Sequence, residues 1–108
     1  MGSSAVLDKL DSLKQLYASG FQNDFLDTAL QKIVQYQVAR DKADLRQVDE
    51  TLGAFERRYG LSSDEFWKRF RAGEMDDIAD YMEWNVLYKA RQRIVARIQV
   101  LQGTVADE

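Results

Sequence analysis

The sequence predicts an all-α fold, in which two long helices form an antiparallel hairpin with a short aromatic connecting helix and an N-terminal helix. Two observations predict this fold. The 108 residues contain no proline, although about five would be expected at average usage, so long helices can run without a break. Apolar residues recur every three or four positions, which is the spacing of one helix face.

The N-terminal helix is predicted over residues 5–18. Ser3 or Ser4 is suited to cap its start, and Gly20 is suited to end it. Its apolar face is rich in leucine and needs a covering partner; it comprises Val6, Leu7, Leu10, Leu13, Leu16 and Tyr17.

The first long helix is predicted over residues 24–59, opened by Asn23 or Asp24. Its apolar residues step by threes and fours, and later by sevens as in a coiled-coil seam: Leu26, Leu30, Val34, Val38, Leu45, Val48, Leu52, Phe55 and Tyr59. A continuous helix of this length would be about 50 Å long and requires a second long helix alongside. The alternative is a break between residues 40 and 44, which would give two helices.

The short connecting helix is predicted over residues 63–72. We expect Gly60 to end the preceding helix in the left-handed conformation. Ser62 followed by Glu65 has the spacing of a capping box, and Gly73 closes the segment. Three aromatic residues fall within five positions and favour a plug at one end of the core: Phe66, Trp67 and Phe70.

The second long helix is predicted over residues 77–102, capped by Asp76 or Asp77 and stopped by Gly103. A connection this short requires the two long helices to run antiparallel, within one domain over residues 1–108. The apolar stripe of the last helix is wider than a two-helix seam. We therefore expect a homodimer that completes a helical bundle.

Composition excludes several classes of function. With no histidine and no cysteine, the chain lacks the usual general base, the usual zinc ligand and any disulfide. We therefore expect no catalytic residues, no cofactor and no metal. The net charge of −3 argues against nucleic-acid binding, and no apolar run is long enough to span a membrane. Met1 to Ser4 lacks the features of a signal peptide, so we expect a cytoplasmic protein.

An acidic cluster at the start of the last helix has two interpretations. Asp76, Asp80 and Glu83 share one helix face, where their oxygens could gather around magnesium or calcium. Acidic residues in a first turn also complement the helix dipole, and this is the favoured interpretation.

The candidate partner-binding residues are aromatic and basic: Trp67, Tyr81, Trp84, Tyr88, Arg91, Arg93 and Arg97. The aromatic residues could instead pack in the core at the end of the bundle, and we favour that role. The arginines, with Lys89, could bind a partner that is acidic or carries phosphate. Alternatively, they pair with carboxylates inside the protein. A second basic run at Lys68, Arg69 and Arg71 could touch DNA, but no DNA-binding motif accompanies it.

Arg91 and Asp41 each interrupt an apolar series on one of the long helices. Antiparallel packing could bring them together as a buried pair that fixes the alignment of the helices. The alternative is that each faces solvent independently.

The segment Phe55-Glu56-Arg57-Arg58-Tyr59-Gly60-Leu61-Ser62-Ser63-Asp64-Glu65-Phe66-Trp67 resembles a family of small bacterial and archaeal helical proteins. Phe70, Ala72-Gly73-Glu74 and Glu83-Trp84 ahead of Leu87-Tyr88 extend the resemblance, which covers residues 30–101. Many members look like antitoxin components of toxin–antitoxin pairs. The segment Gly73-Glu74-Met75-Asp76-Asp77 departs from the pattern, because the family often has an extra glycine after the glutamate.

The resemblance implies a non-catalytic helical protein that binds a cognate toxin, consistent with the apolar surplus on the long helices. The alternatives are a self-assembling structural or scaffold protein and a carboxylate metal enzyme that uses Asp76, Asp80 and Glu83.

Overall fold

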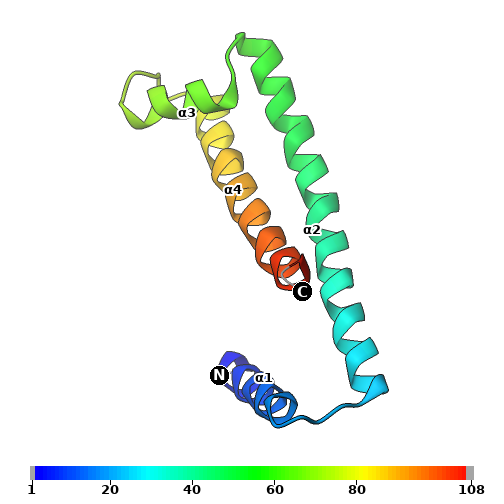
Figure 1. The fold of residues 1–108 in the computed structure, drawn as a ribbon. Helices are drawn as coiled ribbons and strands as arrows, with labels where there is room; N and C mark the ends of the chain where they lie inside the picture. The colour runs from blue at the N-terminus through cyan, green and yellow to red at the C-terminus, as the bar shows by residue number, and fades with distance from the viewer. Residues whose placement is uncertain (1, 107–108) are drawn as a thin grey trace. The chain divides into compact units, whose positions relative to one another are not determined.

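The computed structural model describes residues 2–106, and the side chains of residues 3–103. It confirms the all-α prediction, because the described residues form four helices and no strand. These are α1 (Gly2–Ala18), α2 (Asp24–Tyr59), α3 (Ser63–Arg71) and α4 (Ala79–Ala106) (Figure 1). The chain divides into two compact units after Ile33, inside α2, and each unit is described by itself.

Helix α2 is continuous over 36 residues, so the alternative of a break between residues 40 and 44 is wrong. Asn23 caps it, since its side-chain oxygen accepts a hydrogen bond from the Leu26 backbone N–H at 2.9 Å. Gly60 ends it with a φ of 62°, in the left-handed region that glycine adopts at little cost. Helix α1 begins at Gly2, three residues before its predicted start.

Helix α3 begins as the sequence predicts, but only half of the expected capping box forms. The Ser62 hydroxyl accepts a hydrogen bond from the Glu65 backbone N–H at 3.1 Å. Instead of completing the capping box, the Glu65 carboxylate accepts a hydrogen bond from the Arg69 side chain at 3.1 Å. A carboxylate oxygen of Glu56 accepts from the free backbone N–H of Ser63 at 2.8 Å, so α2 supplies part of the cap of α3.

The ends of α4 differ from the prediction. Neither Asp76 nor Asp77 caps it; the backbone N–H groups of Tyr81 and Met82 both bond to the Ile78 carbonyl at 3.1 Å, and the helix begins at Ala79. At its other end, α4 continues through Gly103 to Ala106. Glycine inside a helix costs only about 1 kcal/mol relative to alanine, so a single glycine does not have to end one.

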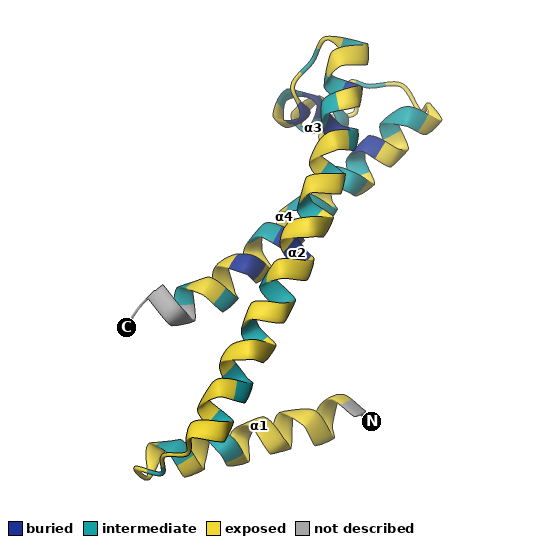
Figure 2. Cartoon of the chain, turned by 90° about the vertical axis from the view of Figure 1, so that its right-hand side faces the viewer, coloured by how far each residue is buried: buried dark blue, intermediate teal, exposed yellow. Residues whose placement is uncertain are grey.

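The main core lies where α2, α3 and α4 meet, and its residues are among the buried ones coloured dark blue in Figure 2. Phe66 and Trp84 are fully buried and stack with ring centroids 4.0 Å apart. Phe55 of α2 lies on Trp84 at 5.5 Å, and Leu52 closes the cluster. The aromatic residues of α3 and the start of α4 therefore plug one end of the helix pair, as the core interpretation predicted.

Helices α2 and α4 run antiparallel, and side-chain pairs fix their alignment. Tyr59 of α2 donates a hydrogen bond to Asp80 of α4. Arg91 donates a hydrogen bond to Asp49 at 2.6 Å. Arg97 donates two hydrogen bonds of 2.8 Å to Asp41. The proposed pairing of Asp41 with Arg91 is wrong, because the correct partner of Asp41 lies six residues further along α4. The contact at Trp84 sets an alignment in which Arg91 faces Asp49 instead.

Candidate partner-binding surfaces

Two of the seven candidate residues belong to the core. Trp84 has no exposed surface, and its indole N–H donates a hydrogen bond to the buried Ser63 hydroxyl at 2.9 Å. Tyr81 is half-buried and meets Tyr59 edge-on, with ring centroids 5.1 Å apart. Neither ring is free to act as an anchor for a partner.

Trp67 and Tyr88 form a stack at the edge of this core. Their ring centroids lie 5.3 Å apart, and the Arg71 guanidinium lies 4.6 Å from the Trp67 ring. The Tyr88 hydroxyl donates to Asp64 at 2.6 Å, and this hydrogen bond to a carboxylate raises the pKa of Tyr88. Two candidate residues are therefore close together, with Tyr88 oriented by α3.

The three candidate arginines lie in three different environments. Arg91 forms an ion pair with Asp49, and both side chains are about half exposed. Arg97 holds the carboxylate of Asp41, which is only 1% exposed, and this pairing lowers the pKa of Asp41. Arg93 is exposed and has no ion pair or side-chain hydrogen bond with any described residue. The arginines do not form one basic patch.

The second basic run is also divided among internal contacts. Arg69 pairs with Glu65, and Arg71 stacks on Trp67. Arg58, a further basic residue near the end of α2, pairs with Asp80 at 3.3 Å. These pairings use charge that a DNA-binding surface would need.

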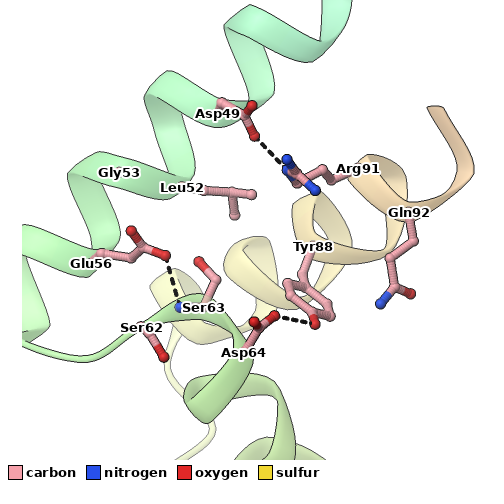
Figure 3. Close-up of a pocket in the computed structure, with 10 residues that line it drawn as sticks. All are labelled: Asp49, Leu52, Gly53, Glu56, Ser62, Ser63, Asp64, Tyr88, Arg91 and Gln92. Atoms are coloured by element: carbon pink, nitrogen blue, oxygen red, sulfur yellow. Dashed lines mark hydrogen bonds and ion pairs between the residues drawn. The ribbon is translucent and has the colours of Figure 1, made fainter. Parts of the chain in front are cut away.

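A cleft of about 490 Å³ lies between α2, the start of α3 and α4 (Figure 3). Its lining carries three carboxylates and one guanidinium: Asp49, Leu52, Gly53, Glu56, Ser62, Ser63, Asp64, Tyr88, Arg91 and Gln92. Each of the charged groups already has a partner within the cleft, as the dashed lines of Figure 3 show. The cleft is thus a polar, internally paired recess.

Sequence reasoning found Tyr88 and Arg91 of this cleft but missed its carboxylates. Asp49 and Glu56 lie seven residues apart, which places them two turns apart on one side of α2. From that spacing, the sequence could have predicted that these two carboxylates lie on the same side of the helix. Asp64 had no such signal, because its place depends on how α3 packs against α4.

Large exposed apolar side chains lie at the start of α4: Ile78, which directly precedes the helix, and Met82 and Val86 within it. We call these three residues the outer face of α4. Their exposed fractions are 40%, 54% and 60%. They follow one another at four-residue steps, opposite the face of α4 that carries Trp84, Ile94 and Ile98 into the core. Helix α4 therefore presents apolar residues on two sides.

A second exposed apolar surface lies on α1. We call it the α1 stripe: Val6, Leu7, Leu10, Leu13, Leu16 and Tyr17. Val6, Leu7 and Leu10 are at least half exposed. The Tyr17 hydroxyl donates to Asp27 at 2.6 Å, which ties α1 to the first turns of α2 and raises the pKa of Tyr17 to about 12.

The predicted alternative of a metal site has no geometric support. Asp80 bonds to Tyr59 and Arg58, and Asp76 and Glu83 do not join it. No group of three or more His, Cys, Asp or Glu side chains in the described part of the chain is arranged to hold a metal ion. None of the helices described is long and apolar enough to cross a membrane.

Comparisons with protein-family models, with curated proteins and with solved structures find no match. The resemblance to antitoxin-like helical proteins therefore stays a prediction.

Proposed function

We propose that the chain is a non-catalytic helical protein that binds another protein, and that it acts as an antitoxin-type partner of a cognate toxin. The observation that carries the proposal is the exposure of the α1 stripe. Leu7 is 63% exposed and Val6 is 55% exposed, although residues of this kind are usually buried.

The arrangement of α1 suits binding in an apolar groove. Val6, Leu10, Leu13 and Tyr17 recur at helical spacing along one side, and the charged residues Asp8 and Asp11 lie on the other. Helices recognised by a groove present anchors at this spacing. Fully burying one leucine is worth about 1.5–3 kcal/mol, so three or four anchors can support a specific complex.

The non-catalytic part of the proposal rests on the side chains available. The chain has no histidine and no cysteine. The charged groups of the cleft are already paired with one another. The runner-up is self-assembly, which the outer face of α4 favours.

The test is co-expression with the product of the neighbouring gene. That product alone should stop growth, the chain should relieve the arrest, and the two proteins should co-purify. The single change Leu10→Asp should abolish co-purification because it places a charge in the centre of the α1 stripe.

The matched control is Gln15→Asp, which adds the same charge at an exposed position on the polar side of α1. It should leave binding unchanged. A harmless neighbour, or two proteins that do not co-purify, would remove the antitoxin proposal. Equal effects of both variants would remove the α1 stripe as the binding surface.

A further inference from the structure

The charges along α4 are divided between its two halves. Asp76, Asp77 and Glu83 lie around its start, and Lys89 and Arg93 lie beyond its first ten residues. None of these five side chains has an ion pair or a side-chain hydrogen bond with another described residue. They remain available to a second molecule, and they border the apolar outer face of α4.

We propose that the outer face of α4 binds a second copy of the chain, with the two α4 helices antiparallel about a two-fold axis at Val86. This arrangement places Val86 against its own copy, with Met82 beside it. Lys89 then lies level with Glu83 of the second copy, and Arg93 lies within one turn of that copy's Asp77. The inference is independent of toxin binding, because it concerns a different helix.

The pattern of charges favours a second copy of the chain as the partner, and it favours an antiparallel orientation of the two α4 helices. A parallel pair would place Glu83 beside Glu83 and Lys89 beside Lys89, and like charges at close range are destabilising. The antiparallel pair places opposite charges together on both sides of the apolar centre. A two-fold interface needs a surface that is complementary to itself, and this helix face has that property.

The first test is the mass of the purified chain by light scattering at about 100 μM. We expect twice the 12.5 kDa of one chain. Val86→Glu should weaken the dimer at least tenfold, because it places two carboxylates against each other at the axis. Gln47→Glu adds the same charge at an exposed site on α2 and should leave the dimer intact.

The second test uses cysteines, for which the chain offers a clean background because it has none. Under mild oxidation, Val86→Cys should form disulfide-linked dimers, whereas Ile78→Cys should not, because the axis separates the two copies of residue 78. Lys89→Glu and Glu83→Lys should each weaken the dimer, and together they should restore it.

A monomer mass would overturn the proposal, as would a dimer that Val86→Glu leaves unchanged. Equal cross-linking at both cysteine positions would show a parallel pair and would overturn the proposed direction. These measurements need only the purified chain, so failure to bind a toxin leaves them unaffected.

Discussion

Asp41 is a buried carboxylate in the middle of α2, and one arginine of α4 keeps it charged. Arg97 donates two hydrogen bonds to it, and Gln37 donates a third at 3.0 Å. These donors satisfy a group that would be costly to bury alone. The arrangement gives the protein a pH-dependent component of stability.

The pKa of Asp41 is lowered, mainly by Arg97, so the folded state releases this proton more readily than the unfolded state does. The stabilisation is therefore present above the unfolded pKa of about 3.9 and is lost as the pH falls through the lower folded value. We expect the urea midpoint to fall more steeply below about pH 4 for the natural chain than for Asp41→Asn. Parallel curves for the two proteins would contradict this prediction.

Trp84 is the second residue whose role the structure defines. Because the ring is fully buried between Phe55 and Phe66, Trp84→Ala should lower the free energy of unfolding by about 3–5 kcal/mol. Urea unfolding measures this change. A loss below about 1 kcal/mol would mean that the ring is not part of the core.

Single residues also show where sequence reasoning stops. The series of apolar positions revealed that Asp41 and Arg91 are interruptions, but it did not reveal which residue each one faces. That depends on the alignment of α2 against α4, which the stacking of Trp84 on Phe55 and Phe66 sets. The pairs Asp41–Arg97 and Asp49–Arg91 could therefore not be read from spacing alone.

At the scale of elements, two glycines in or next to α2 have opposite roles. Gly60 has a φ of 62°, a conformation that β-branched residues rarely adopt, so Gly60→Val should cost at least about 1–2 kcal/mol. Gly53 lies inside the helix, and a Cβ there would meet only the flexible end of Arg57 at 3.2 Å. Gly53→Ala should therefore stabilise the protein by about 0.5–1 kcal/mol. Thermal unfolding of both variants checks the two signs, and a stability loss in Gly53→Ala would show that Arg57 cannot move aside.

Helix boundaries could be predicted where a local side chain forms the cap. Asn23 and Ser62 accept hydrogen bonds from backbone groups three residues ahead, and this chemistry is visible in the sequence. The start of α4 was misplaced because Asp76 and Asp77 have suitable side chains but do not cap the helix. The cleft could not be predicted, since it depends on three helices whose relative placement the pattern does not contain.

At the scale of the whole molecule, the proposed dimer has a thermodynamic consequence. A partner that binds only the folded chain raises its stability by mass action. We therefore expect the melting temperature to rise with protein concentration between about 1 and 100 μM. The Val86→Glu variant should lose this dependence, and a concentration-independent melting temperature of the natural chain would argue against the dimer.

The pairs that align α2 with α4 also constrain how related sequences can differ in length. A single residue inserted between Asp41 and Asp49 would rotate one part of α2 by about 100° relative to the other and separate Asp41 from Arg97. Seven inserted residues complete about two helical turns, so Asp41 and Asp49 would again lie on the same side of α2. The helix would, however, be about 10 Å longer. The pairs survive only if α4 gains the same seven residues between Arg91 and Arg97. Insertions and deletions in these helices should therefore occur in matched heptads.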